Sequence, residues 1–559
     1  MALSPTRLAP ARPAPAWLLA RDMIRGLAVS RTMDVLLVGA LMVVAGVVRW
    51  PHLLMSPQFP SVGDSIMMAL DMAQGRAFYL HDQAPYLGAP FIWLLALVYK
   101  LFGPSIETTM VLMWVIGSLT VVPTYLLGRE VGGRPVAVIA GAFLATSGAH
   151  TVVSSHVALS HSVTPLAATA ALWLVARAVT SGQGWVRPLA WAGLLAGLAL
   201  QTHPTSAPLL VGAGLGAVLM RPGWLRTRGL PLAVAMVLVG YSTLLVYHVT
   251  SHFEIVGDIA GKQERYLDAD VDAGEDSDYG VYVNNLAQLS LATVRLVSGA
   301  LAERPLVSSY LEDPWIVATV GLTLAGIGVA GWRRQWWLVG AVALAVFLPP
   351  AFSGKYRPVL DGRYLMPLVP VLFVAIGLAA AAAARWIVAL SGAVGTAGQP
   401  AVQLAPRLAG SVAVLVLSGG VTLLAAHPLS LLNTFYEDSM EDGFSNALYL
   451  RTLQQVEAAR RPDETVLLDP ALANVKSTGG GKASSSFTFL FALEGVPNDT
   501  LNTARLDNLV GRLVILNRST ANRMSDMLRL DPLDGKRVSG RDTANYRAYR
   551  IGETLAVGR

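Results

Sequence analysis

The sequence predicts a polytopic α-helical membrane protein with about eleven transmembrane helices and a small C-terminal α/β extracytoplasmic domain. Long apolar runs alternate with short Arg-rich pieces throughout most of the chain. Of all residues, 53% are hydrophobic and 14% are charged, whereas soluble domains usually carry about a quarter charged residues. After residue 430 the charge content becomes ordinary, which indicates a separate soluble segment.

A helix needs about 20 apolar residues to cross a hydrocarbon core of roughly 30 Å. The aromatic run 87–102 is shorter, and we interpret it as a helix at the membrane interface. The small-residue run 211–218 predicts close helix packing. The candidate spans are 34–50, 107–127, 136–149, 162–179, 188–201, 206–220, 230–249, 314–331, 336–350, 364–384 and 408–427.

The distribution of arginine predicts the orientation of the chain. Segment 1–33 is basic and is therefore assigned to the cytoplasm, because cytoplasmic loops carry an excess of Lys and Arg. With eleven spans, the later inside loops are also basic, and the acids gather in the outside loops. The transmembrane module is 34–429, with outside loops 51–106, 251–313 and 351–363, and segment 430–559 lies outside. The inside loops contain Arg129, Arg134, Arg177, Arg187, Arg221, Arg226, Arg228, Arg333, Arg334, Arg385 and Arg407, and the outside acids include Asp64, Asp71 and Asp82.

The tail has the pattern of a small α/β domain. The pieces ETVLLD and RLVILN resemble strands, and NALYLRTLQQVEAARR resembles a helix. A segment of this length is large enough to bury a core of its own.

Asp64 is the candidate general base. It follows the first span in the piece FPSVGDSIMMALDMAQGR, at the start of an amphipathic run. Asp64 could simply cap that helix. Alternatively, its carboxylate could remove a proton from an acceptor hydroxyl at the membrane rim. Asp71 is a weaker second candidate acid, and its default role is that of a solvated surface residue.

Three cations in the piece SGKYRPVLDGRYLMPLVPVL, namely Lys355, Arg357 and Arg363, are candidates for binding a phosphate. Basic residues at helix ends often only extend toward the membrane surface. We favour the phosphate role because these cations lie on the predicted outside face, where the positive-inside rule disfavours such a cluster. Three cations can also stabilise negative charge that develops on a leaving group.

Other polar residues have competing interpretations. Arg265 could close over a donor phosphate, but pairing with neighbouring acids is the favoured interpretation. His203, in QTHPTSAPLL, could be a polar helix cap before Pro204 or a phosphate ligand. His150, His156 and His161 have spacings that do not share a helix face, so we interpret them as packing residues rather than zinc ligands.

Three motifs resemble the GT-C superfamily of membrane glycosyltransferases, especially its protein-mannosyltransferase and lipid A aminoarabinose-transferase branch. The first is a span ending in Arg49-Trp50, followed by Asp64 in an outside loop. The second is PYLGAPFIWLLALVYKLFGPS, and the third is GRYLMPLVPVL. The family often has a second acid directly after the first, where this chain has Ser65, and often a Lys where this chain has His203.

This resemblance implies an inverting transfer of a sugar from a polyprenyl-phosphate donor, with Asp64 as the general base. It implies donor-phosphate contacts from the Arg363 region, from His203 and from Arg265. The implied partners are the lipid-linked donor, membrane lipids and a lipid, glycan or protein acceptor, and the implied location is a bacterial-type inner membrane. No cofactor is expected to be required, and a divalent metal is not indicated. A transporter or lipid flippase, or a non-catalytic membrane subunit, is the alternative. Nucleic-acid binding is not expected, because the positive charge is spread over loops between spans.

Overall fold

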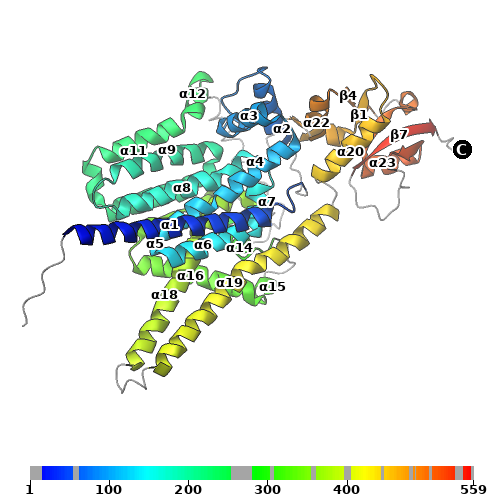
Figure 1. The fold of residues 1–559 in the computed structure, drawn as a ribbon. Helices are drawn as coiled ribbons and strands as arrows, with labels where there is room; N and C mark the ends of the chain where they lie inside the picture. The colour runs from blue at the N-terminus through cyan, green and yellow to red at the C-terminus, as the bar shows by residue number, and fades with distance from the viewer. Residues whose placement is uncertain are drawn as a thin grey trace, which may run out of the picture.

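The protein is a bundle of α-helices with a sheet-containing segment at one end (Figure 1). Its computed structural model describes residues 16–54, 62–82, 84–253, 280–301, 308–353, 361–395, 404–441, 446–476, 482–484, 486–502, 506–534 and 546–554. The piece 391–406, which its Gly and Pro content predicts to be a flexible linker, is helical at both ends, at 391–395 and 404–406, and its residues 396–403 lie outside the described ranges. The acidic run 268–278 also lies outside them.

The first half of the chain is helical. It contains α1 (Ala16–Arg49), α2 (Val62–Ala73), α3 (Pro90–Phe102), α4 (Ile106–Leu119), α5 (Val121–Gly132), α6 (Arg134–Thr146), α7 (Gly148–Ser155), α8 (Ser160–Thr180), α9 (Val186–Thr202), η1 (Pro204–Ser206), α10 (Ala207–Met220), η2 (Pro222–Arg226), α11 (Gly229–Gly240) and α12 (Ser242–Thr250).

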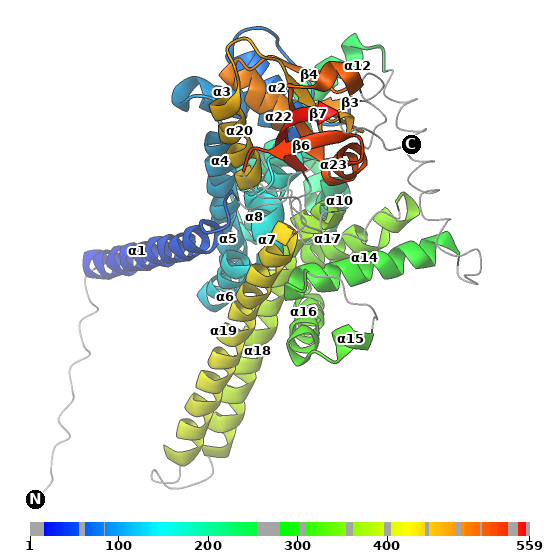
Figure 2. The same ribbon diagram turned by 90° about the vertical axis from the view of Figure 1, so that its right-hand side faces the viewer.

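The bundle is completed by helices from the second half. These are α14 (Val281–Ser298), α15 (Ser308–Leu311), α16 (Pro314–Trp332), α17 (Trp336–Phe347), η3 (Pro349–Ala351), η4 (Asp361–Leu368), α18 (Val369–Gly395) and α19 (Leu404–Glu441). The last two, α18 and α19, run side by side and extend away from the bundle (Figures 1 and 2).

Six helices among the described residues are long and apolar enough to cross a membrane, and the number rises to eight if each of two bent pairs is one span. The bent pairs are α6 with α7 and α11 with α12, which match the predicted spans 136–149 and 230–249. The predicted spans 206–220 and 336–350 correspond to apolar helices that are too short for this criterion. The architecture is therefore that of a helical membrane protein, and the total of eleven spans stays a prediction.

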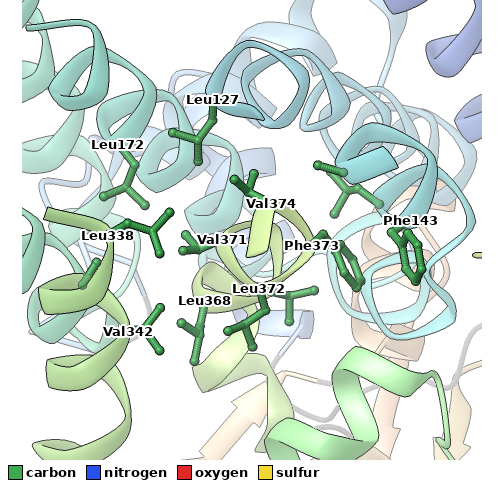
Figure 3. Packing of buried hydrophobic residues seen from close by; sticks show 14 of the residues in the cluster. Leu127, Phe143, Leu172, Leu338, Val342, Leu368, Val371, Leu372, Phe373 and Val374 are labelled. Carbon is green, nitrogen blue, oxygen red and sulfur yellow. The ribbon is translucent and has the colours of Figure 1, made fainter. Parts of the chain in front are cut away.

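The first half of helix α18, residues 369–381, is the centre of the bundle core, and its second half extends out of it. Its residues Val371 and Phe373 are at most 1% exposed, and they pack among side chains from the surrounding helices. Phe143 of α6, Leu172 of α8 and Leu338 of α17 lie around it (Figure 3). Because these side chains come from segments far apart in the sequence, α18 unites the two halves of the chain.

Small residues allow α10 and α17 to approach closely. A Cβ atom added at Gly212 would overlap the carbonyl oxygen of Gly340, and one added at Gly216 would overlap the carbonyl oxygen of Trp336. The predicted packing role of the run 211–218 is therefore confirmed.

Hydrogen bonds gather several of the Arg-rich loops at one end of the bundle. Arg129 and Arg134 bind Asp34 near the start of the first span, at 3.2 and 2.7 Å. Arg221 donates to the carbonyl of Val179 at 2.7 Å. This bond joins the end of α8 to the Arg-rich loop that follows α10. Gln335 donates to the carbonyl of Val131 at 3.0 Å. Loops that the sequence assigns to the same side of the membrane are therefore neighbours.

A five-stranded sheet lies in the C-terminal segment. The order is β4-β1-β5-β7-β6, in which β1 pairs in parallel with β4 and β5, while β7 is antiparallel to β5 and β6. The predicted strand pieces ETVLLD and RLVILN contain β1 and β5, and the predicted helix piece contains α20. The elements are α20 (Asn446–Ala459), β1 (Val466–Leu468), α21 (Pro470–Ala473), β2 (Asn474–Lys476), β3 (Lys482–Ser484), α22 (Ser486–Glu494), β4 (Asn498–Thr500), η5 (Leu506–Leu509), β5 (Leu513–Asn517), α23 (Arg518–Ser525), β6 (Leu528–Pro532) and β7 (Tyr546–Thr554).

Both faces of this sheet are buried along its central strand β5. Along β5, Val514 and Leu516 belong to a cluster on the side of α23, whereas Leu513 and Ile515 belong to a second cluster. Alternate residues of a strand point to opposite faces, so the continuous apolar run of β5 fits a central strand. The second cluster also contains residues of α2, α3, α20 and α22. The C-terminal sheet and the helices after the first span therefore share one hydrophobic core.

Candidate functional site

A buried polar cluster lies where α8 begins, where α9 ends and where η4 passes them. The ring centroids of His161 and His203 are 3.8 Å apart. The ring of Tyr364 lies 5.2 Å from His203 and 5.6 Å from His161, and Tyr86 meets His203 edge-on at 6.1 Å. Four segments that are distant in sequence therefore meet at one point.

The position of His203 follows from the proline after it. A proline disfavours helical geometry in the preceding residue, so α9 ends at Thr202 and His203 is extended, with φ −165° and ψ 134°. Its Nδ1 accepts a hydrogen bond from the backbone N–H of Thr205 at 3.2 Å. The predicted role of His203 as a helix cap is confirmed, and that role directs the other ring nitrogen, Nε2, away from η1.

His203 is held in the neutral state. Burial, together with the nearby positive charge of Arg363, lowers the pKa of His203 to about 3. Since Nδ1 accepts a hydrogen bond from a backbone N–H, the proton of the neutral imidazole is on Nε2. At neutral pH the cluster therefore presents an uncharged N–H donor beside a permanent cation.

Arg363 supplies that cation. Its Nη2 donates to the hydroxyl of Tyr364 at 2.9 Å, and its guanidinium carbon lies 4.6 Å from the centroid of the same ring. Such a cation–π contact is attractive and holds the guanidinium against the ring of Tyr364. Because this ring also lies near both histidines, the Arg363 charge is close enough to lower the pKa of His203.

The turn that contains Leu87 and Gly88 is attached to the end of α9, close to His203. The N–H of Gly88 donates to the carbonyl of Gln201 at 2.7 Å, two residues before His203. An added Cβ atom at Gly88 would lie 2.8 Å from the Cβ atom of Gln201, so this close approach requires glycine. A hydrogen bond of 2.9 Å between the hydroxyls of Thr164 and Thr202 ties α8 to α9.

The structure brings together some of the predicted site residues. His203 and Arg363 lie in one cluster, as described above. The backbone of Asp64 lies in the first turn of α2, and its side chain lies outside the described part of the structure. Asp71 pairs with Arg76 at 2.7 Å, as expected of a surface acid. Lys355, Arg357 and Arg265 lie outside the described residues.

His161, Tyr364 and Asp82 are members or neighbours of the cluster that the sequence did not single out as site residues. Tyr364 directly follows Arg363 within the quoted GRYLMPLVPVL motif, and this adjacency to a predicted site residue could have identified it. His161 was interpreted as a packing residue, and Nδ1 of His161 has no hydrogen-bond partner among the described residues. Within the described part of the chain, no group of three or more His, Cys, Asp or Glu residues is arranged to hold a metal ion.

A second buried network centres on Arg49, at the end of the first span. Arg49 is fully buried and binds the C-terminal end of α6, where the chain bends by 64° into α7. Its guanidinium donates to the carbonyls of Leu144 at 2.9 Å and Ala145 at 2.7 Å, and its Nε donates to Ser155 Oγ at 3.1 Å. A cation is favourable there because the carbonyl end of a helix carries partial negative charge.

The backbone of Arg49 also takes part in this network. Its carbonyl oxygen accepts a hydrogen bond from Nε2 of His156 at 2.7 Å, and Nδ1 of His156 pairs with the hydroxyl of Tyr436 on α19. His156 follows α7 directly and precedes Ser160 and His161 by a few residues. The network therefore anchors the segment that leads into the polar cluster.

Comparison with known proteins supports the resemblance seen in the sequence. Residues 88–247 match the family model described as dolichyl-phosphate-mannose-protein mannosyltransferase. Among curated proteins, none matches this chain.

Solved structures extend the comparison to the fold. The apo structure of ArnT from Cupriavidus metallidurans matches with a TM-score of 0.52 at 14% identity, over 93% of this chain and 98% of that chain. The undecaprenyl phosphate complex of the same protein gives a TM-score of 0.49 at 16% identity, over 92% and 97%. The archaeal oligosaccharyltransferase AglB from Archaeoglobus fulgidus gives 0.42 at 14%, over 72% and 56%. The predicted resemblance to GT-C membrane glycosyltransferases is confirmed, and the chain has the fold of ArnT.

Proposed function

We propose that this protein is a glycosyltransferase that moves a sugar from a polyprenyl-phosphate donor to an acceptor hydroxyl at the extracytoplasmic end of the bundle. The observation that carries this proposal is the cluster of His203, Arg363 and Tyr364, which offers a cation and a neutral N–H donor side by side. Charge-assisted hydrogen bonds of this kind suit a phosphate. The matched mannosyltransferase family and the fold of ArnT are consistent with a lipid-linked donor.

In the proposed reaction, Asp64 takes the proton of the acceptor hydroxyl, and the acceptor oxygen attacks the anomeric carbon of the sugar. The bond between that carbon and the donor phosphate oxygen breaks, and the electron pair leaves with the polyprenyl phosphate. Arg363 and the Nε2–H of His203 stabilise the charge that develops on the leaving phosphate. A single displacement inverts the anomeric carbon. Lys355, Arg357 and Arg265 are proposed as further phosphate contacts.

The location of the site supports this assignment. The Arg-rich loops that meet around Asp34 and Val131 lie at one end of the bundle. Helix α2 and the C-terminal sheet lie toward the other end (Figures 1 and 2). The polar cluster includes His161 in the first turn of α8, whereas Val179, to which Arg221 donates, lies in the last turn of the same helix. With arginine-rich loops facing the cytoplasm, the proposed reaction takes place on the opposite face of a bacterial-type inner membrane.

The first test separates binding from chemistry in purified protein reconstituted in nanodiscs. Arg363→Gln is expected to weaken binding of undecaprenyl phosphate by roughly 10- to 150-fold, because a hydrogen bond to a charged group contributes about 1.5–3 kcal/mol. Asp64→Asn is expected to bind the lipid normally and to form no glycosylated product from polyprenyl-phosphate mannose or arabinose donors. The exposed Arg226 provides the control Arg226→Gln.

Two results would contradict the proposal. Full product formation by Asp64→Asn would remove the assigned base, and unchanged lipid binding by Arg363→Gln would remove the phosphate site. Movement of a lipid-linked sugar across proteoliposomes without any product would instead support the flippase alternative.

A further inference from the structure

Asp82 is a fully buried acid between two helices of the site. Its Oδ1 accepts a hydrogen bond from Ser65 Oγ at 2.7 Å, and its Oδ2 accepts one from Ser160 Oγ. Ser65 follows Asp64 in the first turn of α2, and Ser160 is the first residue of α8, directly before His161. A single carboxylate therefore bridges the helix that carries Asp64 and the helix that carries a histidine of the polar cluster.

The backbone around Asp82 fixes this carboxylate independently of α2. The N–H of Asp82 donates to the carbonyl of Leu87 at 2.8 Å, and the N–H of Leu87 donates to the carbonyl of Ala84 at 2.9 Å. The next residue, Gly88, is bound to Gln201 at the end of α9. The turn is therefore attached to α9, and the two oxygens of Asp82 extend from it toward α2 and α8.

A carboxylate is expensive to bury unless hydrogen bonds replace the water that it loses. Ser65 and Ser160 are themselves fully buried, so both hydroxyls are dedicated to Asp82 rather than shared with solvent. Hydrogen bonds to an ionised acceptor are stronger and more directional than neutral ones. Apolar packing alone would allow α2 to slide or rotate, whereas this bridge specifies one position for its first turn.

We propose that Asp82 is a positioning residue, which holds the first turn of α2, and with it Asp64, at a fixed place relative to α8 and the phosphate-binding cluster. This inference rests on the proposed function, in which Asp64 must reach the acceptor hydroxyl while Arg363 and His203 hold the donor phosphate. Misplacement of a catalytic group by about 1 Å can slow catalysis by about a hundredfold.

The test combines kinetics with hydrogen–deuterium exchange of the full-length protein in nanodiscs. Asp82→Asn has nearly the same shape but carries no charge, so neither link to a serine hydroxyl is charge-assisted any longer and both become weaker. Ser65→Ala removes only the link to α2. Each variant is expected to lower kcat about tenfold and to leave the KM for the lipid-linked donor within about twofold, because the phosphate cluster is retained. Amide exchange over residues 62–73 is expected to become faster in both variants.

A double variant tests whether the two residues act through the same bond. If they do, Asp82→Asn combined with Ser65→Ala lowers kcat little further than either single variant, instead of the roughly hundredfold expected of independent effects. Asp531→Asn and Ser290→Ala are matched controls, because both residues are exposed and their bonds are local, from Arg529 to Asp531 and from Ser290 to the carbonyl of Leu286.

The outcomes distinguish this inference from the proposed function. Unchanged amide exchange over 62–73 in Asp82→Asn would overturn the positioning role, whatever the activity. Independent, multiplying effects of the two substitutions would also overturn it. If amide exchange over 62–73 becomes faster in Asp82→Asn but the unsubstituted protein forms no glycosylated product, the bridge is supported and the glycosyltransferase assignment is refuted.

Discussion

Replacement of Arg49 by methionine is expected to destabilise the protein, because it removes the donors that satisfy the broken end of α6. Methionine is similar in length and apolar, so it fills most of the same space. It cannot donate to the carbonyls of Leu144 and Ala145 or to Ser155. These acceptors stay buried after the substitution, since Ala145 and Ser155 are fully buried in the parent protein.

The size of the effect follows from these contacts. A buried acceptor that loses its partner costs about 1–3 kcal/mol. Leu144 O keeps a weaker bond of 3.3 Å from the N–H of Ser147. Ala45 O also accepts from the Arg49 guanidinium, at 3.0 Å, and it remains within the hydrogen-bonded α1 helix after the substitution. The loss therefore falls mainly on Ala145 O and Ser155 Oγ, and for two such acceptors it amounts to about 2–6 kcal/mol gross. Methionine also avoids the free-energy cost of burying the Arg49 charge, which offsets part of this loss. The net destabilisation is therefore about 2 kcal/mol.

Reversible unfolding by SDS in mixed micelles, followed by circular dichroism, measures this free energy. Arg49→Lys keeps the charge but lacks the planar fork that reaches several acceptors at once, so an intermediate loss is expected. Arg226→Met, at an exposed position, is expected to change the free energy of unfolding by less than about 0.5 kcal/mol. An Arg49→Met protein as stable as the parent, or more stable, would refute the reasoning, because it would mean that the bend does not depend on these donors.

Two further predictions concern the C-terminal segment. Phe489 is fully buried in the core shared with α2 and α3, and its ring lies 6.2 Å from that of Tyr99. Phe489→Ala is expected to cost about 3–5 kcal/mol and to expose residues 446–554 to limited proteolysis, and continued resistance would argue against a shared core. Burial by itself would raise the pKa of Glu464, but hydrogen bonds from Arg550 and from the backbone of Arg461 outweigh it and lower the pKa below 4.5. The ion pair therefore adds stability at pH values above about 4.5 that is lost as the pH falls through the lowered value, so Glu464→Gln should reduce the unfolding midpoint at pH 7 and have no effect near pH 2.

Elements with a local signal could be predicted from the sequence, and elements fixed by remote contacts could not. The runs that became β1 and β5 are short, apolar and β-branched, and the small residues of 211–218 indicated close packing before any partner was known. The span 136–149 was predicted as one helix, but the structure breaks it between α6 and α7. The donors that satisfy the carbonyls at this break come from Arg49, about a hundred residues earlier in the sequence. A local sequence pattern contains no information about such a remote contact.

The same reasoning explains which part of the site was visible in the sequence. His203 and Arg363 stand in recognisable local settings, one before a proline and the other in an outside loop with unexpected positive charge. Asp82 was named only as one of the acids of the first outside loop, because the contacts that bury it, to Ser65, to Ser160 and through Gly88 to Gln201, come from remote parts of the chain.

Ser65 carried the relevant signal, because it stands where the resembled family often has a second acid. In the structure, a carboxylate oxygen of Asp82 lies 2.7 Å from the hydroxyl of Ser65. Two adjacent carboxylates would repel each other, whereas a hydroxyl can donate to a carboxylate brought from another loop. The negative charge beside the first turn of α2 thus comes from Asp82, in the segment that follows this helix. A sequence motif that compares only adjacent positions finds Ser65 there and indicates that the second acid is lacking.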